Sequence, residues 1–261
     1  MSKESKVNSK IGEVRLMKCG EECEIVEYRK YSDITVRFIK TNELVKSEYG
    51  KFKNGTIKSH FTPSVYGVGI IGLEKTKDKY STKLKSYRIW QGMLQRCYDK
   101  KLHEKRPTYK ECKVYDKWLY YYNFKKWFDE NYYEINNEKI CLDKDILIKA
   151  NKIYSPETCI LVPQSINSLF VKSNAIRGEL PIGVRFNKRD DNYLAVCCLF
   201  NSINGESKQK YLGRFNTPEE AFYAYKKAKE ENIKQVADYY KDQIPERLYE
   251  AMCKYEVHID D

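Results

Sequence analysis

Apolar and polar residues alternate in three short segments of the last third of the chain: 181–186, 191–196 and 210–215. A repeat of two residues is typical of half-buried β-strands. The segment 217–240 changes to a helical repeat, and its apolar side chains share one face at 3.6 residues per turn. They are Ala221, Phe222, Ala224, Tyr225, Ala228, Val236 and Ala237. The pattern predicts a three-stranded sheet with one long helix packed across it.

The start of this long helix is also marked in the sequence. Thr217 suits the N-cap position, Pro218 suits the first turn, and Glu220 completes a capping box with Thr217. A second, short amphipathic helix is expected after Asp242. In the middle strand of the sheet, alternation directs three apolar side chains outward, away from the helix: Leu194, Val196 and Cys198.

Near the N-terminus, the same two-residue alternation predicts a small all-β module over residues 1–72. A glycine-punctuated segment, 63–72, closes this module. The alternating segments, separated by turn signals, are 23–28, 33–38 and 43–52.

Helical spacing returns at Lys85, and a second helix, rich in aromatic residues, is predicted near 116–130. We interpret these aromatics as core residues, because such a stripe more often packs than stacks on bases. An apolar strand then begins at Ile140, a polar loop follows, and a strand over 160–162 leads into a helix opening at Pro163. This order defines a ββα unit. The expected fold class is α+β, with modules over 1–72, 73–176 and 177–261.

The distribution of charged residues indicates a class of binding partner. The chain holds 48 Lys and Arg against 37 Asp and Glu, a formal net charge of +11. Residues 77–126 alone hold 15 basic and 5 acidic side chains, a difference of +10. Such a segment favours a polyanionic partner. The phosphate contacts we expect in it are Arg88, Arg96 and Lys100.

Other classes are disfavoured by composition. There is no apolar run of 18 residues and no apolar segment typical of a signal peptide, so we expect no membrane contact and a cytoplasmic protein. Nine cysteines, an odd number, indicate reduced thiols. Cys19 and Cys23 are separated by three residues, which is not the usual zinc-knuckle spacing and is a weak metal signal, and we interpret them as small buried residues.

Four motifs follow one another in the last third: Gly183-Val184-Arg185, Tyr193-x-Ala195, Leu212-Gly213-x-Phe215 and Thr217-x-Glu219-Glu220-Ala221. As an ordered set they resemble the APETALA2/ethylene-response-factor DNA-binding domain. The resemblance implies that the sheet lies in the DNA major groove. Basic residues of the sheet are then the expected contacts, because arginine can read guanine and lysine mostly meets phosphate. They are Arg185, Lys188, Lys210 and Arg214.

Two central motifs are Tyr87-x-x-Trp90-x-x-Met93-x-x-Arg96-Cys97 and the sequence YSPETC at 154–159. With the ββα unit, they resemble the phage branch of the HNH endonuclease family over residues 87–174. The resemblance implies hydrolysis of DNA phosphodiesters with one divalent metal, Mg²⁺ or Mn²⁺. Asp143 on the first strand and Asn167 on the helix match the metal-ligand positions.

The family's base histidine is replaced by Lys144. A lysine with its usual pKa is protonated at neutral pH and cannot act as a general base, although it could stabilise developing charge. Asp143 and Asp145 would share one face of a strand, so this pair could bind Mg²⁺ and position a water. Alternatively, Asp145 pairs with a neighbouring lysine or caps the loop. His103 would substitute as the base only if the fold brought it close.

The sequence therefore predicts a double-stranded DNA-binding protein of phage or mobile-element type, acting in the host cytoplasm if phage-encoded. With a working site it would cleave DNA as homing endonucleases do. One alternative is a non-catalytic regulator or host-defence inhibitor on a degenerate HNH scaffold, with a host or phage protein as its partner. Another is a scaffold that binds protein or a nucleotide-like ligand through its sheet faces.

Overall fold

The computed structural model describes residues 10–78, 80, 83–171, 178–201 and 206–261. The chain forms two compact units: residues 1–131 with 152–155, and residues 132–151 with 156–261. Helices and antiparallel sheets occur in separate stretches of sequence, which confirms the α+β prediction. None of the helices in the described part of the chain is long and apolar enough to cross a membrane.

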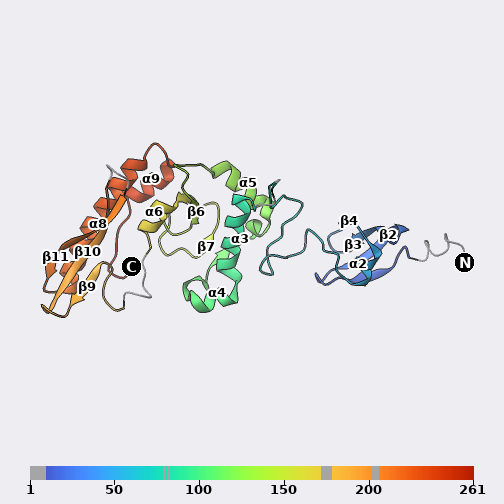
Figure 1. Cartoon of the computed structure of the whole chain (residues 1–261), viewed down its shortest axis with the longest axis horizontal. Helices are drawn as coiled ribbons and strands as arrows, with labels where there is room; N and C mark the ends of the chain where they lie inside the picture. Colours follow the sequence, from blue (N-terminus) through green and yellow to red (C-terminus); the bar gives the residue numbers. More distant parts are fainter. Residues whose placement is uncertain (1–9, 79, 81–82, 172–177, 202–205) are drawn as a thin grey trace, which may run out of the picture. The chain divides into compact units, whose positions relative to one another are not determined.

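The predicted N-terminal β module is a four-stranded antiparallel sheet in sequence order. Figure 1 draws it in blue. Its alternating apolar residues form a buried cluster that includes Ile25, Val36 and Phe38. Cys23 also lies in this core, as expected from the sequence, and Cys19 packs at its edge. The elements are β1 (Val14–Leu16), β2 (Glu22–Lys30), β3 (Asp33–Phe38), β4 (Leu44–Ser47) and helix α2 (Tyr49–Lys53).

Helix α2 corrects the prediction that the third alternating segment stays extended to residue 52. Tyr49 and Phe52 are three residues apart, which places both on one side of a helical turn. Their rings stack with centroids 6.1 Å apart, and Phe52 is fully buried in the core. Burial of this pair outweighs the strand-like alternation, and Gly55, at φ +64°, then reverses the chain.

The rest of the first unit is built around aromatic side chains. The indole nitrogen of Trp90 donates to the carbonyl of Trp118 at 2.6 Å, and Tyr121 and Phe124 are fully buried beside them. This confirms that most of the aromatic stripe is core, whereas Tyr122 is 59 % exposed. The elements are α3 (Lys85–Tyr98), α4 (Lys100–Lys105), η1 (Pro107–Tyr109), β5 (Lys113–Val114), η2 (Asp116–Leu119), α5 (Tyr121–Asn131) and β7 (Ile153–Tyr154), which pairs in parallel with β5.

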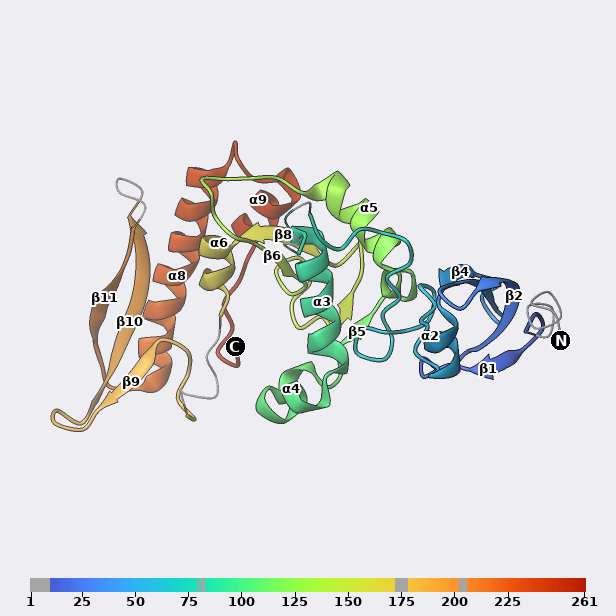
Figure 2. The same cartoon turned by 45° about the vertical axis from the view of Figure 1, so that its right-hand side comes forward.

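The second unit begins with the predicted ββα arrangement. Strand β6 (Ile140–Asp143) pairs antiparallel with β8 (Ile160–Pro163), and helix α6 (Gln164–Leu169) follows directly. Figure 2 shows α6 beside the two strands. Every residue of β8 is buried, so this strand reads as one continuous apolar run.

The same unit contains the predicted three-stranded sheet, in the order β11-β10-β9, with α8 lying along it (Figures 1 and 2). The capping box of Thr217 and Glu220 is present at the start of α8. A side chain at Gly183 would place its Cβ 2.0 Å from the ring of Tyr225, so only glycine lets the sheet approach α8 here. The elements are β9 (Val184–Asn187), β10 (Asn192–Asn201), β11 (Glu206–Phe215), α8 (Pro218–Tyr240) and α9 (Glu246–Cys253).

Candidate functional site

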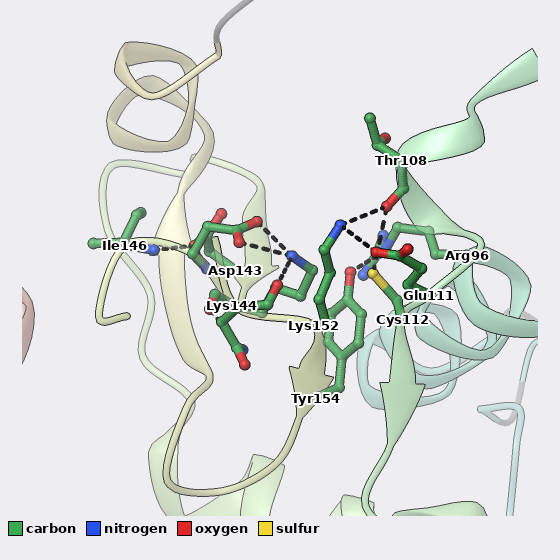
Figure 3. Close-up of polar contacts among 11 residues, drawn as sticks. Arg96, Thr108, Glu111, Cys112, Asp143, Lys144, Ile146, Lys152 and Tyr154 are labelled. Atoms are coloured by element: carbon green, nitrogen blue, oxygen red, sulfur yellow. Dashed lines mark hydrogen bonds and ion pairs between the residues drawn. The ribbon is translucent and has the colours of Figure 1, made fainter. Parts of the chain in front are cut away.

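The three acidic and basic residues expected to be catalytic lie where β6 ends and the chain turns. Asp143 is the last residue of β6. Its Oδ1 accepts hydrogen bonds from the backbone amides of Asp145 and Ile146, both at 2.7 Å (Figure 3). An aspartate that accepts from amides two and three residues later forms a turn around its own side chain. Asp143 therefore closes the turn at the end of the strand.

Burial raises the pKa of the Asp143 carboxyl above its ordinary value, although the two backbone hydrogen bonds oppose this shift. The folded protein thus holds the proton of Asp143 more tightly than the unfolded chain does. Stability contributed by this group is present at low pH and is lost as pH rises through the raised pKa. At neutral pH the negative charge of Asp143 is a net burden on the fold.

Lys144 is buried, with 7 % of its surface exposed. Its Nζ donates to both carboxylate oxygens of Asp145 at 2.7 Å and to the backbone carbonyl of Asn151 (Figure 3). The Asn151 side chain in turn donates to the Lys144 carbonyl at 2.9 Å. We call this set of Lys144, Asp145 and Asn151 the ammonium cage. It closes the loop 143–151 on itself.

The ammonium cage bears directly on the chemistry expected at this loop. The Asp145 carboxylate pairs with a neighbouring lysine, which is one of the two interpretations the sequence left open. A protonated amine with three oxygen acceptors cannot take a proton from water. Both oxygens of Asp145 accept from Lys144, so the ammonium occupies the point at which a cation would contact both oxygens together.

Asp143 and Asp145, the acidic residues expected to hold a divalent metal, already accept hydrogen bonds within the loop. Asn167 is half-buried on α6, and the contact recorded for it is its carbonyl accepting from the Phe170 amide at 3.3 Å. Within the described residues, no group of three or more His, Cys, Asp or Glu side chains is placed to hold a metal ion. His103, which the sequence offers as a substitute base if the fold brings it close, lies on α4, with its Nε2 2.8 Å from the carbonyl of Arg96.

Substitutions at Asp143 should separate a structural from a catalytic carboxylate. Asp143→Asn keeps an oxygen for the two amides and removes the buried charge, so stability at neutral pH should be unchanged or higher. Asp143→Ala removes the acceptor and should cost about 1–2 kcal/mol. Urea unfolding between pH 4 and pH 8 measures both, and the Asn variant should lose the fall in stability above about pH 4, the ordinary aspartate pKa. Equal losses in the two variants would contradict the assigned role.

The three phosphate contacts expected on α3 and α4 are placed differently from one another. Arg88 and Lys100 are exposed. Arg96 is half-buried; its Nε donates to the Tyr154 hydroxyl at 2.8 Å, and its guanidinium lies 5.2 Å from that ring (Figure 3). Tyr154 is 2 % exposed, and burial raises its pKa well above the usual value. Arg96 thus joins the two central motifs, 58 residues apart, and is part of the core.

Exposed basic residues lie on α3, on α4 and in the turn that follows α4. Asp99 caps α4 by accepting from the amides of Lys101 and Leu102, which holds this short helix in place. Glu111, at the end of this turn, is paired with Lys152 at 3.5 Å. The exposed basic residues are Arg88, Lys100, Lys101, Lys105, Arg106 and Lys110, and we call them the α3–α4 basic surface.

On the C-terminal sheet, strand register decides which basic residues share a face. Leu194 pairs with Arg185 on one side and with Arg214 on the other, so these three form a row across the outer face. Lys210 pairs with Cys197, which is buried toward α8, so Lys210 lies on the opposite face. Lys188 is exposed in the turn after β9.

A β-bulge explains why simple alternation misplaces Lys210. The register shifts between Ala195 and Val196, which leaves one extra residue on β11. From Tyr211 back to the start of β11, each side chain therefore lies on the face opposite to the one that alternation from Arg214 predicts. Tyr211 consequently pairs with Val196 on the outer face and is 52 % exposed. The alternation rule alone did not select Tyr211. Arg214 is fixed by an ion pair with Asp190 at 2.8 Å.

Comparison of the chain with models of known protein families, with curated proteins and with solved structures finds no match.

Proposed function

We propose that this chain binds double-stranded DNA and that its β6–β8–α6 unit acts as a scaffold and not as a nuclease. The observation that carries the first half is the α3–α4 basic surface, which lies within the segment of +10 net charge. Lysine and arginine side chains that neutralise phosphates release counterions, and this release dominates the affinity of most DNA-binding proteins.

The outer face of the C-terminal sheet supports the same proposal. Arg185 and Arg214 stand on either side of Leu194, and the exposed Tyr211 lies further along the same face. Paired arginines on a sheet can read base edges in the major groove, while Lys210 on the other face is left out of such a contact. The expected contacts of this module are therefore Arg185, Arg214 and, from the adjoining turn, Lys188.

The second half of the proposal rests on the ammonium cage. Lys144 satisfies Asp145, and Asp143 satisfies the backbone of its own turn, so both acidic residues have structural partners. Hydrolysis with Mg²⁺ or Mn²⁺ would require the loop 143–151 to rearrange. A DNA-binding regulator that acts in the cytoplasm, of the host if phage-encoded, needs no such change.

Binding of a labelled DNA duplex at increasing salt tests the proposal. With about four phosphate contacts, affinity should fall about 100-fold from about 50 to about 200 mM salt. Arg88→Ala combined with Lys100→Ala should weaken binding about tenfold at low salt and flatten the salt slope by about 1.8. Fluorescence anisotropy measures both quantities.

The matched control changes the same charge elsewhere. Lys30 and Lys53 are exposed lysines of the N-terminal module, and their double alanine variant should bind as the wild type does. Equal loss in the two double variants would show that only overall charge matters. Absence of binding at low salt would instead favour a protein partner, for which the apolar positions Leu194 and Val196 on the outer sheet face offer a surface. Metal-dependent nicking of a plasmid that Asp143→Asn abolishes would restore the nuclease interpretation.

A further inference from the structure

The N-terminal module contains a crevice of about 650 Å³. It lies between the turn that leaves β1, at Lys18, and the segment that follows α2, from Gly55 to Ser64. A volume of this size is within the usual range for small-molecule sites. Neither the basic surface nor the C-terminal sheet contributes to it, so the proposed DNA binding leaves this crevice unexplained.

The walls of the crevice are held by hydrogen bonds within the module. The Lys18 amide donates to the Gly55 carbonyl at 2.8 Å, which ties the two walls together. The Ser59 hydroxyl accepts from the Phe61 amide at 3.1 Å, and Ser59 is buried. A site on such a wall is ordered before a ligand arrives, which reduces the entropy lost on binding.

His60 is oriented by a carboxylate at the edge of the crevice. Glu43 accepts from the His60 backbone amide at 2.9 Å and from the Nδ1 of its ring. The Glu43 side chain is 7 % exposed, whereas that of His60 is 52 % exposed. Because Glu43 holds Nδ1, the imidazole presents Nε2 as its other polar atom.

The lining has cationic groups and no carboxylate. Lys18 and Lys58 line it together with His60. Among the residues that the structure describes, neither lysine forms an ion pair, and the nearby Glu43 is engaged by His60. Two ammonium groups around one hollow attract an anion, and phosphate oxygens are suitable acceptors for both. With its Nδ1–H on Glu43, the neutral His60 ring has Nε2 as an acceptor, which suits a ligand hydroxyl.

The remaining lining suits the rest of such a ligand. Ser59 and Ser64 provide hydroxyls that can both donate and accept, while Pro63 and Ile71 provide apolar surface. A phosphate alone would use only the cationic part of the wall. We propose that the N-terminal crevice binds a nucleoside phosphate, as a free mononucleotide or as one nucleotide of a strand, with Lys18 and Lys58 contacting the phosphate.

Isothermal titration calorimetry on the full chain tests this proposal, with adenosine monophosphate as the probe and inorganic phosphate as the comparison. The mononucleotide should bind more tightly than phosphate. Lys18→Ala combined with Lys58→Ala should lower its affinity at least about tenfold, since each removes a charge-assisted contact. The Lys30→Ala, Lys53→Ala double variant should bind it as the wild type does. All four lysines are exposed, and a thermal melt confirms folding.

No heat of binding to the wild type at millimolar mononucleotide, or equal losses in the two double variants, would overturn the proposal. Equal affinity for phosphate and mononucleotide would overturn the nucleoside part of it. A single-stranded oligonucleotide that binds more tightly than the mononucleotide, and only when Lys18 and Lys58 are present, would identify a strand as the source. The Arg88→Ala, Lys100→Ala variant should retain mononucleotide binding, so the two proposals can fail separately.

Discussion

Replacing Lys144 by methionine should lower the free energy of unfolding by about 2–3 kcal/mol. Methionine keeps an unbranched stem of similar length, so packing changes little, but Asp145 and the Asn151 carbonyl lose their donor. The Asp145 side chain is half exposed and can be solvated by water, so the effect should stay below the ~3–5 kcal/mol of a fully buried broken pair. Urea unfolding with an unchanged m-value measures the loss.

The same variant should bind divalent cations more tightly than the wild type does. Removing the ammonium leaves two carboxylate oxygens and a carbonyl directed at one point, and hard divalent cations prefer such oxygens. Millimolar Mg²⁺ or Mn²⁺ should therefore raise the Tm of Lys144→Met and leave that of the wild type unchanged, because a ligand stabilises only the state it binds.

Lys139→Met is the matched control for both measurements. Lys139 is an exposed lysine in the same compact unit, so its substitution changes the charge equally without touching the ammonium cage. The control should lose less than about 0.5 kcal/mol and show no metal effect. Stabilisation of the wild type by metal, equal to that of Lys144→Met, would contradict the idea that the ammonium occupies a cation position.

Local signals in the sequence were sufficient for much of the fold. The Thr217–Glu220 capping box and the change from a two-residue to a 3.6-residue repeat predict α8 and the strands before it, because both depend only on neighbouring residues. Helix α2 could not be predicted in this way. Its single turn exists because Phe52 is buried against strands that lie earlier in the chain.

The candidate site shows where local patterns are insufficient. Alternation placed Asp143 and Asp145 on one face of a strand, but the strand ends at Asp143 and a turn begins, so the alternation no longer applies. The burial of Lys144 depends on a carbonyl seven residues later, at Asn151. On β11, one bulge reverses the facing of Lys210. Each of these features arises from a contact that no repeat in the sequence encodes.

Arg96→Ala should cost about 2–4 kcal/mol, the sum expected for a charge-assisted hydrogen bond and a desolvated cation–π contact. Arg88→Ala, on the exposed side of the same helix, should cost less than about 0.5 kcal/mol. The reason is that Arg96 fills the space beside the buried Tyr154 ring and gives its hydroxyl a donor, whereas the Arg88 side chain faces solvent. Chemical denaturation of the two variants measures this difference directly.

A double-mutant cycle with Tyr154→Phe tests whether the stability loss of Arg96→Ala comes from the Arg96–Tyr154 hydrogen bond. Removing the hydroxyl should couple to Arg96→Ala by about 1–2 kcal/mol, because the two changes remove the same hydrogen bond. Arg96→Lys should recover only part of the loss, since an ammonium lacks the planar array of donors of a guanidinium. If Arg96→Ala unfolded no more easily than Arg88→Ala but weakened DNA binding equally, Arg96 would belong to the α3–α4 basic surface after all. Its contact with Tyr154 would then not stabilise the packing of the two central motifs against each other.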